Sequence, residues 1–327
     1  MSKNNKQWKS FESQISLMQE RGLNIDDNKN AENFLSITSY HRFNSYRFPF
    51  LKDKNICKDI YKNEAKFSEI VNLYYLDIQY KALLSQLLQF IEIAFKTQLI
   101  YHFSKKDPSF YAKRNLYIAK KSNIKSNEDI DKKFNNIQSQ ATSQNNIHID
   151  YYFKKNCKCK KTKYSKCKCN AKPAPAWIAL EGLSFGALID VYKLCSFNDD
   201  IKNKVANFFG ISNYKMFIPI LTDVKRIRDI VSHYDKVLDR ESFIKVESNS
   251  SINRFINTNY DLIFLNRNQK TYLPYFLIIK FLIQQLIVKS DYTNYIKDVY
   301  NNFVVMSYDN KKYLSLEILD SNEFEII

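Results

Sequence analysis

The longest regular hydrophobic pattern in this chain runs from Phe67 to Phe103. Apolar residues recur there every three or four positions, which places them together on one face of an α-helix. They are Ile70, Leu73, Leu76, Tyr80, Leu83, Leu84, Leu87, Leu88, Ile91, Phe95 and Leu99. The pattern predicts one long helix, which would be the main pillar of a helical bundle.

Polar residues form a second stripe along the same predicted helix. Its members are Asp77, Lys81, Ser85, Gln89, Glu92 and Lys96. A stripe of this kind usually faces solvent. Glu92 lies between Ile91 and Ile93, and for that reason we expect it to be the most buried member.

Shorter periodic segments predict further helices along the chain. They cover residues 10–21, 28–37, 178–194, 201–209, 214–238, 272–288 and 295–303, with partial helix in 118–155. Residues 272–288 contain Lys280 and two glutamines and are short for a membrane span, so we expect a core helix there. Residues 304–319 contain Asp309-Asn310 and predict a small C-terminal hairpin.

Composition supports an all-α fold and a polyanionic partner. The 327 residues include only four Gly and six Pro, which favours long helices. A formal net charge of +16, with 15% aromatic residues, favours a nucleic-acid partner. The alternative is a genome-wide bias toward Lys, Asn and Ile. The first residues lack the apolar segment of a secretory signal, so we expect a cytoplasmic protein.

The chain divides into three expected parts. Residues 1–60 form an N-terminal helical segment with aromatic and basic residues, residues 61–303 form the bundle, and residues 304–327 form a tail or hairpin. An insertion of about residues 118–172 lies within the bundle.

The N-terminal segment contains a block, residues 40–50, in which aromatic and basic side chains alternate. Aromatic rings next to Arg can stack on bases while the guanidinium contacts phosphate. We therefore expect Arg42, Tyr46 and Arg47 to contact RNA. The alternative is a packed connector whose rings complete a core.

The insertion contains two Cys-x-Cys motifs, which are formed by Cys157 and Cys159 and by Cys167 and Cys169. Four thiols match the ligand number of a tetrahedral structural Zn²⁺ site. Nine lysines between Lys154 and Lys172 favour the thiolate form that binds metal. The alternative is a Lys-rich loop with incidental thiols.

The candidate chemistry lies in the segment Val224–Arg240. Arg228, Asp229 and His233 form an Arg-polar-x-x-x-His string, and on a helix Asp229 and His233 would share a face. An Arg can hold phosphate with its planar fork, and a His can move protons near neutral pH. Lys225, Arg226 and Arg240 would contact RNA around this string. The spacing alone is weak evidence.

Four ordered blocks resemble the Abi-like abortive-infection proteins of the AbiD/AbiF type, a branch of the HEPN ribonuclease superfamily. They are residues 11–50, with Tyr-His-Arg-Phe-Asn-Ser-Tyr-Arg-Phe-Pro-Phe; residues 73–102, with Leu-Tyr-Tyr-Leu-Asp and Phe-Ile-Glu; residues 175–186, with Pro-Ala-Trp; and residues 228–240. The resemblance implies a HEPN-like helical bundle and a metal-independent endoribonuclease, often a dimer with a composite site. It also implies a toxin-like role in phage defence, in some relatives together with a cognate structured RNA.

Carried over to this chain, the resemblance makes Arg228, Asp229 and His233 the catalytic residues. Asp229 and Ser232 depart from the family, which usually has Asn and Ala at these positions. Two alternatives remain. The protein could bind a structured RNA without cleaving it, or Arg228 and His233 could be surface residues of a structural module.

Overall fold

The computed structural model describes residues 7–52, 59–118, 127–142, 149, 151–152, 173–238, 272–314, 316 and 321–327. These residues form helices, short 3₁₀ turns and three isolated β-bridges, without a sheet. The all-α prediction is therefore confirmed. No helix in these ranges combines the length and the apolar character needed to cross a membrane.

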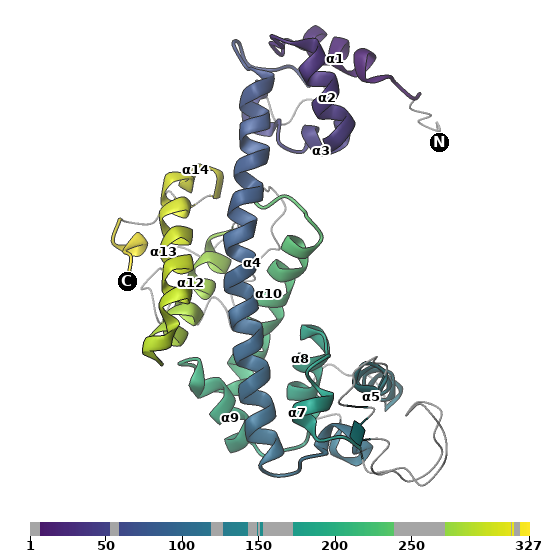
Figure 1. Cartoon of the computed structure of the whole chain (residues 1–327), viewed down its shortest axis with the longest axis vertical. Coiled ribbons are helices and arrows are strands. Elements are labelled where there is room, and N and C mark those ends of the chain that lie inside the picture. The colour runs from purple at the N-terminus through teal and green to yellow at the C-terminus, as the bar shows by residue number, and fades with distance from the viewer. Residues whose placement is uncertain are drawn as a thin grey trace.

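Helix α4 (Phe67–Ser104) is the axis of the molecule (Figure 1). At 1.5 Å per residue its 38 residues extend for about 57 Å. Glu69 stabilises its first turn, because the Glu69 carboxylate accepts from the Lys66 backbone N–H at 3.0 Å. The prediction of one long helix over this range is confirmed.

The other helices lie around α4 at four places. Helices α1 (Phe11–Glu20), α2 (Asn28–Thr38) and α3 (Tyr40–Asn44) lie at its N-terminal end (Figure 1). Helices α12 (Leu273–Ile287), α13 (Asn294–Asp309) and α14 (Lys311–Leu314) lie along one side, and α10 (Tyr214–Ser232) packs along another. Near its C-terminal end lie α7 (Ala176–Ala179), α8 (Phe185–Leu194) and α9 (Asp199–Phe208), with α5 (Asn127–Thr142) against α8.

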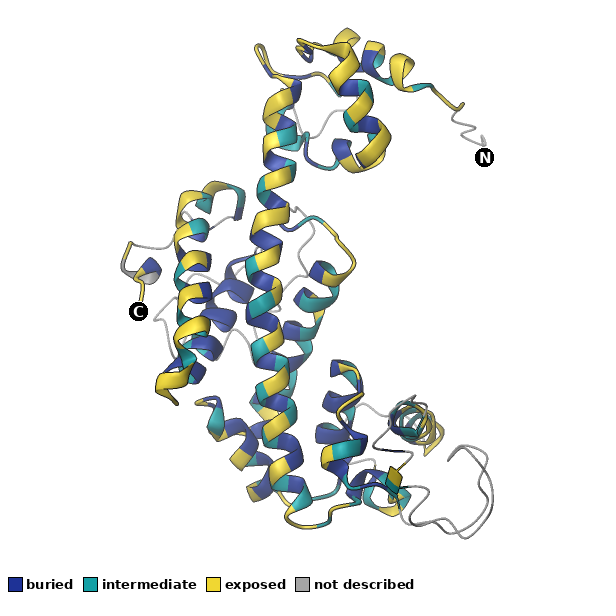
Figure 2. Cartoon of the chain, viewed as in Figure 1, coloured by how far each residue is buried: buried dark blue, intermediate teal, exposed yellow. Residues whose placement is uncertain are grey.

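Buried residues lie along α4 and on the helices packed around it, while α1, α5 and α14 bury residues against α2, α8 and α13 (Figure 2). Helix α12 is almost entirely buried, because α4, α10 and α13 all contact it. This confirms that residues 272–288 form a core helix. Side chains of Ser10, Asp27, Ser184, Asn198 and Asn213 accept from the first backbone N–H groups of their helices, which explains where α1, α2, α8, α9 and α10 begin.

Three predicted elements were wrong in their extent. The helix predicted over 178–194 is two helices, separated at residues 180–184. The helix predicted over 214–238 ends at Ser232. The hairpin predicted over 304–319 is helix in its described residues up to Leu314. Asn310, the expected turn, is the C-cap of α13, and Phe303, Val304 and Ser307 are buried on one face of that helix. The expected boundary at residue 303 falls inside α13.

Candidate active site and the turn that follows it

A polar cleft of about 430 Å³ lies between α4 and α10. Helix α4 contributes Ser85, Gln89, Glu92 and Lys96, and α10 contributes Arg228, Val231 and Ser232. Four of the six residues of the polar stripe on α4 therefore line this cleft; Ser85 and Gln89 are exposed, and Glu92 and Lys96 are half-buried. The stripe forms one wall of the candidate site.

Arg228 is held in the cleft by two carboxylates. Its Nε lies 3.4 Å from Oε2 of Glu92, and its NH1 lies 3.6 Å from Oδ1 of Asp229. Its side chain is 40% exposed, so the guanidinium is accessible to a ligand. Asp229 is shared, because it also forms an ion pair with Lys225 one turn earlier on α10. Asp229 thus partly neutralises two cations at once.

Lys96 closes one end of the cleft. Its ammonium group donates to the backbone carbonyl of Glu181 at 2.7 Å and lies 3.5 Å from the Glu181 carboxylate. The Lys96 side chain is only 13% exposed, whereas Glu181 is largely exposed. This contact joins the turn between α7 and α8 to the wall formed by α4.

His233 is the C-cap residue of α10, with φ −90° and ψ 9°. Its backbone N–H still donates to the carbonyl of Asp229 at 2.9 Å, so the expected one-turn spacing holds at the very end of the helix. The residue is exposed and directly follows Ser232, which lines the cleft. Of the three predicted catalytic residues, only Arg228 lines the cleft; Asp229 and His233 do not. No side-chain hydrogen bond to His233 occurs within the described residues.

The turn after His233 has a defined geometry. Tyr234 adopts a left-handed conformation with φ +59°. Its N–H donates to the carbonyl of Val231, and the N–H of Asp235 donates to the carbonyl of Ile230. These two bonds form a Schellman motif, which usually has Gly at the position of Tyr234.

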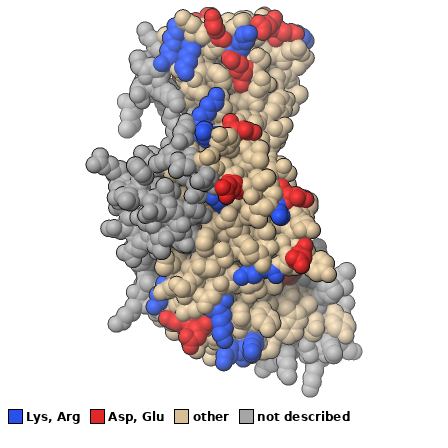
Figure 3. All heavy atoms as spheres, turned by 90° about the vertical axis from the view of Figure 1, so that its left-hand side faces the viewer, with Lys and Arg blue, Asp and Glu red and all other residues tan. Residues whose placement is uncertain are grey.

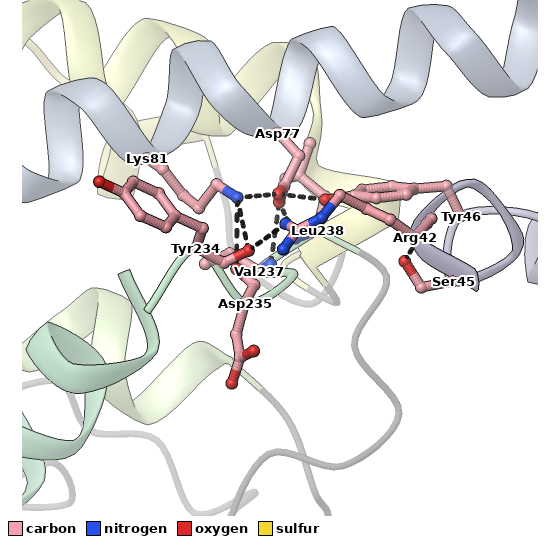
Figure 4. Close-up of polar contacts among 9 residues, drawn as sticks. All are labelled: Arg42, Ser45, Tyr46, Asp77, Lys81, Tyr234, Asp235, Val237 and Leu238. Atoms are coloured by element: carbon pink, nitrogen blue, oxygen red, sulfur yellow. Dashed lines mark hydrogen bonds and ion pairs between the residues drawn. The ribbon is translucent and has the colours of Figure 1, made fainter. Parts of the chain in front are cut away.

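The carboxylate of Asp77 on α4 holds the segment that follows this turn (Figure 4). One oxygen accepts from the backbone N–H groups of Val237 and Leu238 at 2.9 and 2.8 Å. The other accepts from the Tyr46 hydroxyl at 2.7 Å and lies 2.9 Å from the Lys81 ammonium. Asp77 is 0% exposed and Lys81 is 7% exposed. A buried charge is tolerated here because four groups satisfy it.

Two cations bind the carbonyl groups of the same turn. Arg42 of α3 donates to the Tyr234 carbonyl at 2.8 Å, and Lys81 donates to the carbonyls of Tyr234 and Asp235 at 3.4 and 3.3 Å (Figure 4). Lys236 reaches back to the Ser45 carbonyl at 2.6 Å. The segment that follows His233 is therefore held by both α3 and α4.

Burial and the neighbouring carboxylate of Asp77 raise the pKa of Tyr46 far above its ordinary value. The Tyr46 hydroxyl consequently stays protonated at neutral and mildly alkaline pH and donates to Asp77. The Asp77 cluster thus keeps its donor pattern over the whole physiological range.

The structure places five of the six expected RNA-binding residues against protein groups. Tyr46 is 1% exposed, as the packed-connector alternative expects. Arg47 pairs with Asp59 at 2.8 Å, and Arg226 pairs with Asp223. Arg42 and Lys225 make the contacts given above. Arg240 lies outside the described residues, and so do Cys157, Cys159, Cys167 and Cys169. Within the described ranges, no cluster of His, Cys, Asp and Glu could hold a metal ion.

The Asp77–Lys81 pair was not expected from the sequence. The expectation that Glu92 is the most buried member of the polar stripe is wrong. The Glu92 side chain is 17% exposed, whereas Asp77 is fully buried. The available signal was the position of Asp77 and Lys81, at i and i+4 in the longest helix. That spacing is typical of an ion pair, but it does not reveal a backbone segment about 160 residues later.

The surplus positive charge is not concentrated on the described surface. On the face that carries α12–α14, Lys and Arg are interspersed with Asp and Glu (Figure 3). The ranges outside the described residues contain 21 of the 50 Lys and Arg but only 8 of the 34 Asp and Glu. Most of the net charge therefore lies in those ranges.

The family model described as Abi-like protein matches residues 33–239. The match begins in α2 and ends directly after the segment bound by Asp77, so it includes α4, α10, the polar cleft and His233. No curated protein and no solved structure matches the chain.

Proposed function

This chain belongs to the Abi-like family, which is associated with abortive infection in phage defence, and from this premise we propose that it is a metal-independent endoribonuclease of the HEPN type. The observation that carries the proposal is the polar cleft between α4 and α10. Arg228 lies in its wall, and His233 ends the helix beside it. The effector would cleave RNA in response to infection.

The proposed reaction is transesterification. The ribose 2′-oxygen attacks the adjacent phosphorus while a general base takes its proton, and the bond from phosphorus to the 5′-oxygen breaks as a general acid protonates that oxygen. The products are a 2′,3′-cyclic phosphate and a 5′-hydroxyl. His233 performs one proton transfer, and Arg228 stabilises the charge that develops on the phosphorus oxygens. In a homodimer, His233 of the second copy would perform the other proton transfer.

The acidic neighbours of Arg228 affect how it binds phosphate. Glu92 and Asp229 orient the guanidinium, but they also compete with phosphate for it. Asp229 is less of a competitor than its charge implies, because Lys225 pairs with it. Phosphate binding therefore requires the ligand to displace or outcompete weak contacts of 3.4 and 3.6 Å, which are longer than a good charged hydrogen bond.

Single-stranded RNA with a fluorescent 5′-label tests the proposal in buffer with EDTA. Wild-type protein should produce fragments with 2′,3′-cyclic phosphate ends, identified by mass spectrometry. Arg228→Ala and His233→Ala should each reduce the cleavage rate by at least about 100-fold. Arg114→Ala and His102→Ala are matched controls, since both residues lie outside the cleft. Equal cleavage by all preparations would indicate a contaminating nuclease and would refute the proposal.

A second function is supported by the two carboxylates on Arg228, which weaken a catalytic role for it. In this alternative the protein binds a structured RNA without cleaving it. RNA affinity would then fall steeply with salt, while the labelled RNA would remain intact. The cleavage assay and a binding titration in the same buffers separate the two functions.

A further inference from the structure

Tyr234 is a large aromatic residue at a position where the backbone favours glycine. Its φ of +59° is left-handed, and it follows the last turn of α10 in the Schellman motif. Among the described residues, Ser39 and Glu64 are the other non-glycine residues with positive φ, so Tyr234 is the aromatic case. A bulky side chain costs free energy in this conformation, and glycine would avoid that cost. The requirements of the turn therefore do not explain the tyrosine.

The Tyr234 side chain does not belong to the core either. It is 71% exposed, and no described aromatic ring or cation packs on it. Exposure alone is common for a tyrosine. Exposure combined with an unfavourable backbone conformation, beside a candidate active site, is the kind of outlier that indicates a functional constraint.

The backbone of Tyr234 is held from several directions. Its carbonyl accepts from Arg42 at 2.8 Å and from Lys81 at 3.4 Å, and its N–H donates to the carbonyl of Val231 at 3.1 Å. Asp77 holds the residues three and four positions later. The ring therefore projects from a fixed backbone, so a flat ligand that stacks on it has less ordering to bring about.

Tyr234 lies close to the end of the polar cleft between α4 and α10. It directly follows His233, and its carbonyl contacts Lys81, which is one helical turn from Ser85 in the cleft wall. Figure 4 shows the Tyr234 ring at the Lys81 end of the residues drawn. Ser85 is exposed, so a ligand in the cleft can extend from Arg228 past Ser85 to the ring.

A nucleobase of single-stranded RNA suits this position. Arg228 in the cleft can hold a phosphate, and Tyr234 is six residues later, which is about 9 Å in the direction of the helix axis at 1.5 Å per residue. A base and the phosphates beside it span a comparable length. Every base has a face that can stack on an aromatic ring, and a single strand leaves that face accessible.

We propose that the Tyr234 ring stacks on the nucleobase next to the phosphate held by Arg228, and that it thereby places the ribose beside His233. The proposal rests on the RNA cleavage proposed above and assigns the residue that selects single-stranded RNA. It explains why a tyrosine occupies a position suited to glycine. It also gives a purpose to the anchors from α3 and α4, which fix the backbone that carries the ring.

Binding of RNA that cannot be cleaved tests this contact separately from catalysis. One probe is a 5′-labelled 2′-O-methyl RNA octamer, which lacks the attacking hydroxyl, and the other is the same backbone without bases. Fluorescence anisotropy measures the affinity of both probes for wild-type protein and for Tyr234→Gly. The variant should bind the intact octamer at least about fivefold more weakly than wild type and bind the abasic octamer equally well. Its melting temperature should stay equal or rise, because glycine relieves the left-handed conformation.

Two further variants complete the test. Tyr234→Phe keeps the ring and should restore binding of the intact octamer to within about twofold of wild type. Tyr292→Ala removes an exposed ring that does not line the cleft and should leave binding unchanged. In the cleavage assay, Tyr234→Gly should raise KM more than it lowers kcat.

Three results would overturn the proposal. They are equal binding of the intact and abasic octamers by wild type, an equal loss for both octamers in Tyr234→Gly, and failure of Tyr234→Phe to restore binding. If wild type cleaves no RNA but prefers the intact octamer in a manner that depends on Tyr234, the ribonuclease function is refuted and the stacking contact is supported.

Discussion

Asp77→Asn should be among the most damaging single-atom changes in this protein. The substitution replaces one carboxylate oxygen with an amide nitrogen and removes the negative charge. The remaining oxygen can still accept from the N–H groups of Val237 and Leu238. The new amide group, however, is a donor placed 2.9 Å from another donor, the Lys81 ammonium.

The expected cost follows from the burial of the pair. Removing one partner of a buried ion pair costs about 3–5 kcal/mol, because the other charge stays buried and uncompensated. Lys81 is 7% exposed and retains two long contacts to the carbonyls of Tyr234 and Asp235. These contacts offset part of the cost, so we expect a loss of about 3 kcal/mol in the free energy of unfolding.

Lys81→Met should cost less than Asp77→Asn. The carboxylate then keeps three neutral donors at 2.7–2.9 Å, which stabilise its charge without a cation. We expect a loss of about 1–2 kcal/mol. The double variant with Asp77→Asn and Lys81→Met should lose about 1–2 kcal/mol less free energy of unfolding than the sum of the two single losses. In that variant no buried charge is left without its partner.

Equilibrium unfolding in urea, followed by far-UV circular dichroism, measures these values, provided the slope with urea stays constant. Glu32→Gln is the control, because it removes an i,i+3 ion pair whose Lys29 side chain is 80% exposed, and it should change stability by under about 0.5 kcal/mol. A loss below about 1 kcal/mol for Asp77→Asn, or a strictly additive double variant, would refute the coupling inferred here.

Three further outcomes are expected. Asp229→Asn removes a carboxylate beside Arg228, so the affinity for RNA should rise. The dependence of log K on log salt concentration should steepen by the equivalent of about one additional phosphate contact. Binding titrations at several salt concentrations measure both. Tyr234→Gly relieves a left-handed conformation at the C-terminus of α10 and should raise the free energy of unfolding by about 0.5–1 kcal/mol; a decrease would contradict the capping role. Burial raises the pKa of the Cys195 thiol to about 11, so iodoacetamide at pH 8 should label Cys195, detected by peptide mass spectrometry, only after unfolding.

Helical periodicity was sufficient to predict most of the fold. The range predicted for α4 agrees with the structure to within one residue at its end, because apolar positions recur without interruption and few breakers occur nearby. The start of α2 was also predictable, since Asp27 is a good N-cap. Where local chemistry determines an element, the sequence alone locates it.

Helix ends without a Gly signal could not be predicted. The apolar pattern continues from Val231 to Val237 and Leu238, and it therefore extended the predicted helix past its true end at Ser232. Tyr234 takes the left-handed position that Gly usually occupies, and carbonyl contacts from Arg42 and Lys81 support the turn. These contacts come from distant parts of the chain, so a local pattern does not contain them.

The assignment of Arg228 and His233 to an active site stays a prediction, and the surroundings of these residues could not be predicted. Arg228 and His233 were identified from their spacing, whereas Glu92, Lys96 and the Glu181 carbonyl enter only through packing of α4, α10 and the α7–α8 turn. A polar stripe tells which side chains share a face. It does not tell whether that face meets solvent or another helix.

Stability alone does not explain why a buried Asp77–Lys81 ion pair occurs here. We expect the pair to position the turn that follows His233. Well-packed apolar residues often replace a buried ion pair with equal or better stability. Asp77→Leu with Lys81→Leu leaves neither charge buried, yet it removes the acceptor for the Tyr46 hydroxyl and two backbone N–H groups, at some cost in stability, and the donor to two carbonyls in the turn after His233. That variant should retain cooperative unfolding and lose RNA cleavage, with kcat falling more than KM changes. A fully active double Leu variant would show that the turn needs no such anchor and that the pair serves only folding.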